Sequence, residues 1–309
     1  MLASCGAPLD KFLPAKHAFS TKLLRSGQVG GFIPKMADSQ RRHKLIHRLR
    51  NRSRIVAAKA YLSLRSRLSG GTFWIDLDGI KLPFHGDGDL QEIYYYLDGK
   101  EWWDQGLPLM ARYIRPGGVA IDVGANLGFA SGIFSALTGE TGQVYSFEPS
   151  PTTYAKLLEV IQANQYKNVS PYNLGCGRDE QSMTLYCPTS SGNATFRPDA
   201  SMEQSTRNCP TVGIVNLDNF LGSRLERLDF LKIDTEGYED EVLAGAAGLL
   251  KRFNPIIYIE FSSQYLATSE NAARILRDLG YTFEPELRLD EAFLGDNFFA
   301  LPRGYQAAL

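Results

Sequence analysis

The sequence between Val119 and Leu301 alternates strand patterns with helix patterns, and this alternation constrains the fold more than any other feature. The predicted strands cover residues 119–123, 143–148, 229–234, 255–261 and 297–301, and the helices predicted after the first two cover residues 128–137 and 151–165. Apolar runs separated by helical patterns are typical of parallel strands joined by crossover helices. We therefore expect an α/β fold, a doubly wound and mostly parallel sheet with helices on both faces.

The chain of 309 residues is 44% hydrophobic and 22% charged, so it can bury a large core and lacks the polar bias of a disordered protein. We expect three parts. Residues 1–70 form a basic, partly disordered or helical extension, residues 71–118 a hairpin and helical lead-in, and residues 119–309 the main domain. A start of translation at Met36 would shorten the extension.

The N-terminal part is strongly basic, although the whole chain has a net charge of only −1. Residues 1–75 contain 15 Lys and Arg against two acids, a net charge of +13, which leaves −14 for the remainder. Because phosphate binding needs clustered Lys and Arg, we expect no nucleic-acid partner for the acidic main domain.

Residues 41–68 have the pattern of a basic amphipathic helix, which Gly70 and Gly71 end. Its apolar residues recur at helical spacing: Leu45, Leu49, Val56, Ala60, Leu64 and Leu68. Two interpretations are open. The helix makes a weak contact with an anionic membrane, or it docks on the main domain by its apolar stripe.

Three shorter features lie on either side of the first predicted strands. Thr72 to Leu77 and Ile80 to Phe84 flank a turn at Asp78-Gly79, which predicts a β-hairpin. The aromatic residues within 94–103 either line a substrate pocket or cover the edge of the core. The segment from Cys187 to Thr211 has no periodicity, and a long segment of this kind is a candidate substrate lid.

The cysteines give no sign of a metal site or a disulfide scaffold. Cys5, Cys176, Cys187 and Cys209 form no CxxC pair and have no histidines at metal-ligand spacing. No run approaches the roughly 20 apolar residues that a membrane-spanning helix needs. We expect a soluble, cytoplasmic protein.

The segment Asp122-Val123-Gly124-Ala125-Asn126-Leu127-Gly128 gives the strongest indication of chemistry. It follows a strand and opens a helix, where backbone amides approach ligands at the switch point of open α/β sheets. Glu148 stands twenty residues after Gly128, the place of an acid that binds ribose hydroxyls. A dinucleotide fold requires G-x-G-x-x-G, but Asn126 and Phe129 occupy the second and third glycine positions. The pattern favours a cofactor with one nucleoside and no pyrophosphate.

Four motifs together resemble the FkbM-type methyltransferases over about Val119 to Leu301. They are Ile121 to Gly128, Phe147-Glu148-Pro149, Leu231 to Glu239 and Ile259-Glu260. The resemblance implies a Rossmann-like class I methyltransferase fold with seven strands, the last antiparallel, and S-adenosylmethionine as the cofactor. Tyr238 departs from the small residue that we expect between Gly237 and Glu239.

The resemblance also implies roles for residues of the cofactor site. Asp122 and the loop from Gly124 through Asn126 to Gly128 would hold the methionine part of the cofactor, and Glu148 its ribose. Asn173 to Cys176, at the end of the third strand, would lie near the adenine.

Carboxylates are the candidates for a catalytic base, from which methylation of a hydroxyl gains. The histidines are His17, His43, His47 and His85, so residues 119–309 contain none. Asp234 ends a strand at the ligand-binding edge, and we expect Glu236 and Glu260 nearby. Alternatively, these acids cap a helix or pair with Lys232. We assign no metal site, although Asp234-x-Glu236 resembles the acidic pairs with which glycosyltransferases bind metals.

The sequence therefore predicts an S-adenosylmethionine-dependent methyltransferase. The family resemblance implies methylation of a hydroxyl oxygen on a sugar, glycan or secondary metabolite. Two alternatives stay open, a glycosyltransferase that uses a nucleotide sugar and a non-catalytic S-adenosylmethionine-binding protein. Neither the acceptor nor the oligomeric state follows from the sequence.

Overall fold

The computed structural model describes residues 53–77, 80–85, 92–93, 96–97, 109–187, 194–198, 209–284 and 296–305. All of these belong to one unit, Asn51–Leu309. The predictions for residues 1–52, for most of the aromatic stretch and for most of the candidate lid lie outside the described residues. The boundaries after residues 70 and 118 stay a prediction.

The main domain contains the five strands and two helices for which residue ranges were predicted, with ends that differ by at most one residue. The third strand ends at Tyr172, before the predicted segment Asn173 to Cys176, because Gly175 and Cys176 belong to a strand of another sheet. The strands are β3 (Val119–Val123), β4 (Gln143–Phe147), β5 (Val169–Tyr172), β9 (Phe230–Ile233), β10 (Ile256–Phe261), β11 (Thr282–Glu284) and β12 (Asp296–Leu301). The helices are α3 (Phe129–Thr138), α4 (Pro151–Asn164), α6 (Leu217–Leu221), α7 (Glu239–Gly245), α8 (Ala247–Phe253) and α9 (Leu266–Asp278), with a 3₁₀ turn η2 (Ser263–Tyr265) before α9.

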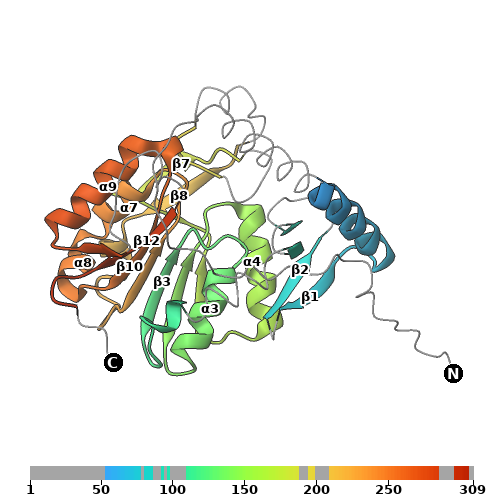
Figure 1. The fold of residues 1–309 in the computed structure, drawn as a ribbon, viewed down its shortest axis with the longest axis horizontal. Coiled ribbons are helices and arrows are strands. Elements are labelled where there is room, and N and C mark those ends of the chain that lie inside the picture. The colour runs from blue at the N-terminus through green and yellow to red at the C-terminus, as the bar shows by residue number, and fades with distance from the viewer. Residues whose placement is uncertain are drawn as a thin grey trace, which may run out of the picture. The chain divides into compact units, whose positions relative to one another are not determined.

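These strands form one sheet in the order β11-β12-β10-β9-β3-β4-β5 (Figure 1). Strands β10, β9, β3, β4 and β5 are parallel to one another. Strand β12, the last in the chain, is antiparallel to both β10 and β11. The chain moves from β3 outward to β5 and then returns to β9 on the other side of β3. The switch point, where open sheets bind ligands, therefore lies between β3 and β9.

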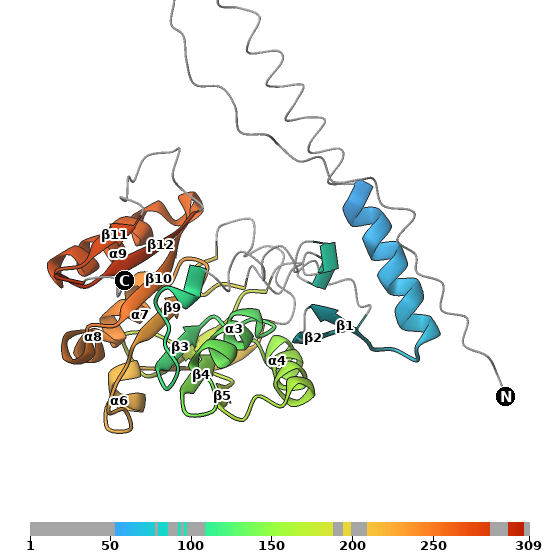
Figure 2. The same ribbon diagram turned by 60° about the horizontal axis from the view of Figure 1, so that its bottom comes forward.

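Two buried clusters show that the sheet is covered on both faces, because alternate strand residues belong to different clusters. Ile121, Leu231 and Ile257 pack with helices α6 to α9. Ala120 and Phe230 pack with α3, α4 and the N-terminal elements. The orange helices α7 to α9 and the green helices α3 and α4 in Figure 2 form these two layers. The doubly wound fold is confirmed.

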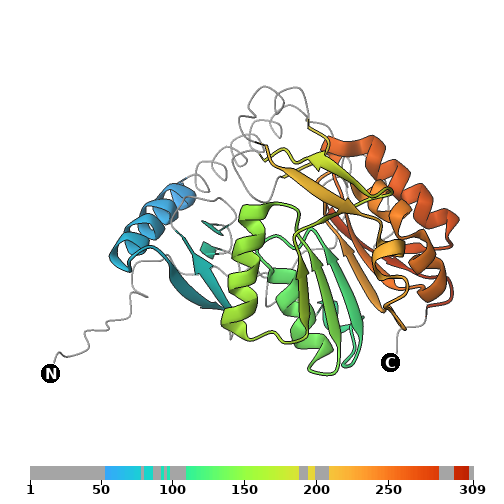
Figure 3. The same cartoon turned by 180° about the vertical axis from the view of Figure 1, so that it is seen from behind.

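A second sheet of three strands was not predicted. It has the order β6-β8-β7 and consists of β6 (Gly175–Cys176), β7 (Gln181–Thr184) and β8 (Thr211–Val215) (Figure 3). Its small core contains Leu185, Phe196, Val212, Ile214 and Tyr238. Phe196 belongs to the described part of the candidate lid, so this sheet carries one wall of the site described below.

The elements before the main domain are a helix at residues 53–68 and the predicted hairpin of β1 (Phe73–Leu77) and β2 (Ile80–Phe84). Gly70 and Gly71 end the helix with positive φ angles of 82° and 125°. At the other side of the hairpin, Asn164 of α4 accepts from the Lys81 amide at 2.7 Å and donates to its carbonyl at 2.8 Å. Tyr96, the described part of the aromatic stretch, stacks on Tyr61 at 5.6 Å.

The docked face of the 53–68 helix is not the one expected. Ala58, Leu62 and Ser66 are buried against the hairpin and its neighbours, whereas the predicted apolar stripe, residues 56, 60, 64 and 68, is exposed. Ser66 Oγ also donates to the His85 carbonyl at 3.0 Å. The interpretation that the helix docks by that stripe is wrong, because Ala58, Leu62 and Ser66 of the other face make the contact. Among the described residues, no helix has the length and apolar character needed to cross a bilayer.

Candidate functional site

A cavity of about 520 Å³ lies at the carboxyl ends of β3, β4, β9 and β10. Some of its polar residues, such as Glu148 and Asp234, directly follow these strands, whereas Lys232 and Glu260 lie within β9 and β10. Apolar walls come from Phe129 of α3, from Phe147 of β4 and Tyr258 of β10, and from Leu174 and Phe196 beside the small sheet. The cavity combines apolar walls with several convergent polar groups, and its volume is in the range of pockets that bind small molecules.

In the loop between β3 and α3, the backbone conformation and a close neighbour leave no room for a side chain at Gly124. Gly124 has φ of 79°, and a Cβ there would lie 1.8 Å from the carbonyl oxygen of Asp234. The amides of Gly124 and Ala125 both donate to the Phe147 carbonyl, at 3.0 and 2.9 Å. Asn126 has φ of 49°, and its buried Oδ1 has no hydrogen-bond partner. The loop is thus fixed between β4 and β9 and leaves a polar atom unsatisfied.

Glu148 is fixed by the backbone at the end of β4. Its Oε2 accepts from the Asn126 amide and its Oε1 from the Ser150 amide, both at 2.9 Å. Burial raises the pKa of Glu148 to about 7, although the two amides and Lys232 favour the charged form. The carboxyl therefore ionises near neutral pH and faces the cavity as a hydrogen-bond acceptor.

Lys232 lies between two acids because of the strand register. Asp122 of β3 is the direct neighbour of Lys232 on β9. The Lys232 Nζ lies 3.4 Å from Asp122 Oδ1 and 3.2 Å from Asp234 Oδ2, and donates to the Gly124 carbonyl at 3.1 Å. Burial alone would lower the pKa of Lys232, but Asp234 and Asp122 together raise it. Lys232 is therefore a permanent cation beneath the site.

Asp122 itself lies below the cavity. It is fully buried, and its Oδ2 accepts from Ser131 Oγ of α3 at 2.6 Å. Ser131 in turn contacts Ser146 Oγ of β4 at 2.8 Å. Asp122 joins the loop, the sheet and Lys232 rather than lining the cavity.

Asp234, Glu236 and Glu260 come together in the lining of the cavity, with one carboxylate oxygen of each within 4.8 Å of the others. Burial opposes ionisation of Asp234, but the Lys232 ammonium outweighs it and the pKa is lowered. Burial and the nearby Asp234 raise the pKa of Glu236 to about 7 and that of Glu260 to about 9. At neutral pH the cluster therefore combines an ionised Asp234 with a protonated Glu260. The spacing would also suit one metal ion.

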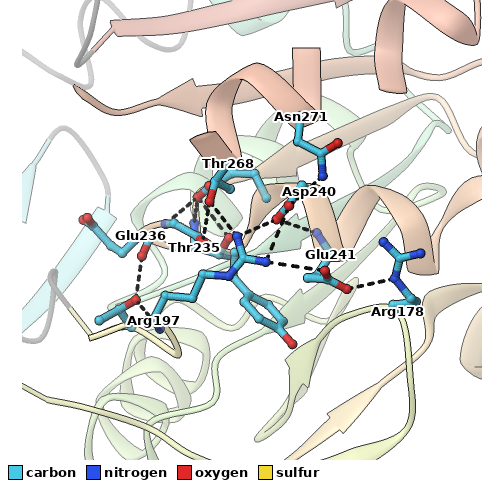
Figure 4. A network of polar contacts seen from close by, with 12 residues as sticks. Arg178, Arg197, Thr235, Glu236, Asp240, Glu241, Thr268 and Asn271 are labelled. Atoms are coloured by element: carbon cyan, nitrogen blue, oxygen red, sulfur yellow. Dashed lines mark hydrogen bonds and ion pairs between the residues drawn. The ribbon is translucent and has the colours of Figure 1, made fainter. Parts of the chain in front are cut away.

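A polar network fixes the segment 194–198 over the start of α7 (Figure 4). Thr195 Oγ1 donates to the Glu236 carbonyl at 2.7 Å. Arg197 pairs with Asp240 at 2.9 Å and donates to Thr268 Oγ1 of α9 at 2.5 Å. Ala194 and Phe196 of the same segment line the cavity, so the network holds one wall in place.

Tyr238 does not occupy the cavity. Its ring packs on Phe196, with centroids 5.3 Å apart, and lies under the Arg197 guanidinium at 5.2 Å. Space for the ring exists because Gly177 stands beside it, where a Cβ would lie 3.0 Å from Tyr238 Cε1. The departure from a small residue at this position enlarges the core of the small sheet.

The structure brings six of the nine predicted site residues to the cavity: Gly124, Asn126, Glu148, Asp234, Glu236 and Glu260. Asp122 and Gly128 support the loop from below, and the Asn173 side chain donates to the carbonyls of Glu148 and Pro149 at 2.9 and 3.0 Å. Lys232, Thr235 and Tyr258 also line the cavity and were not proposed as site residues. The sequence does contain a signal for Lys232. It stands two residues before Asp234, and residues two apart along a strand point to the same face of the sheet.

Comparison with known proteins shows the family of this chain. A family model described as the methyltransferase FkbM domain matches residues 122–283. Methyltransferase 1 of Beauveria bassiana is 27% identical over 143 residues, which are 40% of this chain and 57% of the relative. Hexuronic acid methyltransferase AglP of Haloferax volcanii is 28% identical over 142 residues, 44% of this chain and 53% of the relative. The chain spans about half the length of these curated relatives.

Among solved structures, a methyltransferase FkbM from Methylobacillus flagellatus aligns with a TM-score of 0.42 and 16% identity. That alignment covers 80% of this chain and 58% of the other.

Proposed function

The chain belongs to the methyltransferase FkbM family, and from this we propose that it transfers a methyl group from S-adenosylmethionine to a hydroxyl oxygen of a sugar or secondary metabolite. A sugar acceptor is supported by the name of the Haloferax volcanii relative, which methylates a hexuronic acid. The observation that carries the proposal is that Glu148 and the ionised Asp234 face one cavity. The glycosyltransferase alternative has no support from the family.

The residues present fit this cofactor. Glu148 is a carboxylate acceptor suited to a ribose diol, and Asn126 offers a buried oxygen without a partner beside it. When bound, S-adenosylmethionine supplies an electrophilic methyl group whose leaving group is a neutral thioether.

The protein's own residues would orient the acceptor and take its proton. Asp234 is held ionised by Lys232, so it is suited to accept a hydrogen bond, and then the proton, from the acceptor hydroxyl. Glu260 is protonated at neutral pH and donates to Asp234 instead of competing as a base. Two carboxyls with environments that separate their pKa values are a common sign of distinct acid and base roles.

Binding is tested with S-adenosylhomocysteine and NAD in a thermal shift assay. At about 100 times its dissociation constant, S-adenosylhomocysteine should stabilise the protein by roughly 2.7 kcal/mol, whereas NAD should not. Glu148→Ala should weaken this shift. Stabilisation by NAD alone would overturn the cofactor assignment.

Turnover is tested with methyl-labelled S-adenosylmethionine and a panel of sugars, uronic acids, glycans and hydroxylated metabolites, with mass spectrometry of the products. We expect one methyl group on an oxygen of a sugar or related metabolite. If the protein binds S-adenosylmethionine but transfers no methyl group to any compound of the panel, the non-catalytic interpretation is favoured.

A further inference from the structure

The helix at residues 53–68 presents an unusual amount of apolar surface. Six large hydrophobic side chains are exposed in the described chain, and four of them, Val56, Tyr61, Leu64 and Leu68, lie on this one helix. Leu68 is 79% exposed and Val56 is 68% exposed. Single exposed hydrophobic residues are ordinary, but a contiguous group on one element indicates a surface that binds something.

The exposed residues form a face opposite to the docked one. Residues 56, 60, 64 and 68 recur every four positions, and so do the docked residues 58, 62 and 66. The two sets are offset by two positions, which at 100° per residue places them about 200° apart around the helix. The helix therefore makes its contact with the hairpin by one side and leaves the other apolar side in solvent.

Basic residues lie around this apolar face and, in the case of Arg67, within it, since the helical spacing places Arg67 between Val56 and Ala60. The helix carries Arg54, Lys59, Arg65 and Arg67, all exposed, and no acidic residue. Arg65 lies over the Phe73 ring at 4.7 Å and donates to Tyr61 Oη at 3.1 Å, so it stands at the margin between the helix and the hairpin. In sequence, residues 39–75 contain no Asp or Glu.

We propose that this face of the 53–68 helix binds the surface of an anionic lipid bilayer, with the helix axis in the plane of the membrane. Apolar side chains between cations are the features that hold an amphipathic helix at such a surface. Nucleic acid would use the cations but not a stripe of Val and Leu, because phosphates contribute charge alone. The cavity belongs to another part of the same unit, so lipid binding does not require the proposed chemistry.

Co-sedimentation of the full-length protein with vesicles tests this proposal. The protein should pellet with phosphatidylcholine vesicles that contain phosphatidylserine and much less with phosphatidylcholine alone. Binding should weaken as salt shortens the Debye length from about 10 Å at 0.1 M to about 3 Å at 1 M. The double variant Leu64→Gln/Leu68→Gln should lower the partition coefficient by about tenfold or more, because it removes two buried leucines from the bound state.

Leu266→Gln is the matched control, since Leu266 is also an exposed leucine, at 40%, but lies at the start of α9. It should bind vesicles like the wild type, and all variants should keep the wild-type melting temperature. The proposal is overturned if the full-length protein does not pellet with anionic vesicles. It is also overturned if the double variant binds as tightly as the wild type, and displacement of that binding by RNA would identify a polyanion site instead.

Discussion

The Lys232 Nζ lies 3.2 Å from Asp234 Oδ2. Lys232 is a buried cation on β9, and Asp234, two residues later in the turn after the strand, is an acid that faces the cavity. The same ammonium lies 3.4 Å from the fully buried Asp122. One side chain therefore compensates the charge of the acid beneath the loop and sets the ionisation of the acid in the cavity.

Lys232→Met should be strongly destabilising at neutral pH, because it leaves a buried carboxylate without its partner. Loss of one member of a buried pair removes about 3–5 kcal/mol. Urea unfolding measures this. The deficit should shrink as the pH falls, because Lys232 lowers the pKa of Asp234 and without it Asp234 takes up a proton more readily. Lys251→Met, in the exposed last turn of α8, is the control. Equal stability of the two variants would contradict the proposed compensation.

Cofactor binding should depend on pH through Glu148, whose pKa burial raises to about 7. If only the carboxylate form binds the ribose, the ionised fraction and the affinity rise about tenfold between pH 6 and pH 8. Calorimetry with S-adenosylhomocysteine measures this rise. Glu148→Gln should bind S-adenosylhomocysteine more weakly, and its affinity should not rise with pH. If the affinity of the variant rises with pH as that of the wild type does, another group causes the pH dependence.

The same shift has the opposite effect on the protein without ligand. Because the folded pKa of Glu148 lies above its ordinary value of 4.5, the folded protein binds more protons than the unfolded chain between these values. Stability contributed by this group therefore falls as the pH rises from 4.5 to about 7. Glu148→Gln should unfold with a flatter pH dependence over that range.

Arg197→Gln should loosen the wall formed by Ala194 and Phe196, since Arg197 joins this segment to Asp240 and Thr268. We expect a higher KM for the acceptor, a lower melting temperature and little change in S-adenosylhomocysteine affinity. Arg178→Gln is the matched control, because both arginines pair with Glu241, Arg197 at 3.4 Å and Arg178 at 3.0 Å, but Arg178 is exposed. That pair should contribute at most about 1 kcal/mol. Identical kinetics for the two variants would count against a role of Arg197 in positioning.

His85 should make the attachment of the hairpin sensitive to pH. Its Nδ1 contacts Glu92 at 2.8 Å and its Nε2 contacts Glu159 of α4 at 3.0 Å. The hydrogen bond to Glu92 is the main reason that the pKa of His85 is raised, although burial opposes it. The stabilisation is thus complete below 6.5, the ordinary value, and is lost as the pH rises through the higher folded value.

Melting temperatures from about pH 6 to about pH 9 compare the wild type with His85→Gln. The wild type should lose more stability over this range than the variant. Glu159→Gln should give an intermediate slope, because Glu92 remains. Parallel curves for the wild type and His85→Gln would show that the pair does not stabilise the hairpin.

The sequence was sufficient to locate the main sheet because its strands are buried runs of apolar residues with polar residues at their carboxyl ends. It was not sufficient for the small sheet. Strand β6 has only two residues, and three of the four residues of β7 are exposed, so neither has the periodicity of a half-buried strand. Phe196 in the cavity wall depends on that sheet and was missed for the same reason.

Contacts between segments that are far apart in the sequence explain why the roles of Lys232 and Arg197 were not predicted. The role of Lys232 depends on the register that places it beside Asp122, and Arg197 contacts residues of α7 and α9 that lie far along the chain. The docking interpretation for the helix at 53–68 named the wrong side, because small or apolar residues lie on two sides of the helix and the larger stripe is the one left exposed.

The last prediction concerns Asp234, which is ionised, faces the cavity and has no histidine beside it among the residues that line the cavity. Asp234→Asn keeps the shape and removes the charge. It should leave S-adenosylhomocysteine affinity nearly unchanged and lower kcat by on the order of 100-fold or more, as loss of a general base does. The measurement requires saturating acceptor, because a change in KM alone would indicate a binding role.

Glu236→Gln and Glu260→Gln complete this experiment. Glu260 is protonated at neutral pH, so Glu260→Gln should preserve its hydrogen bond to Asp234 and retain most of the activity. If Asp234→Asn is fully active while one of the other two is inactive, the base is that other residue. If all three are inactive and activity requires an added divalent cation, the cluster binds a metal. Wild-type turnover in all three would mean that alignment of donor and acceptor carries the reaction without a carboxylate base.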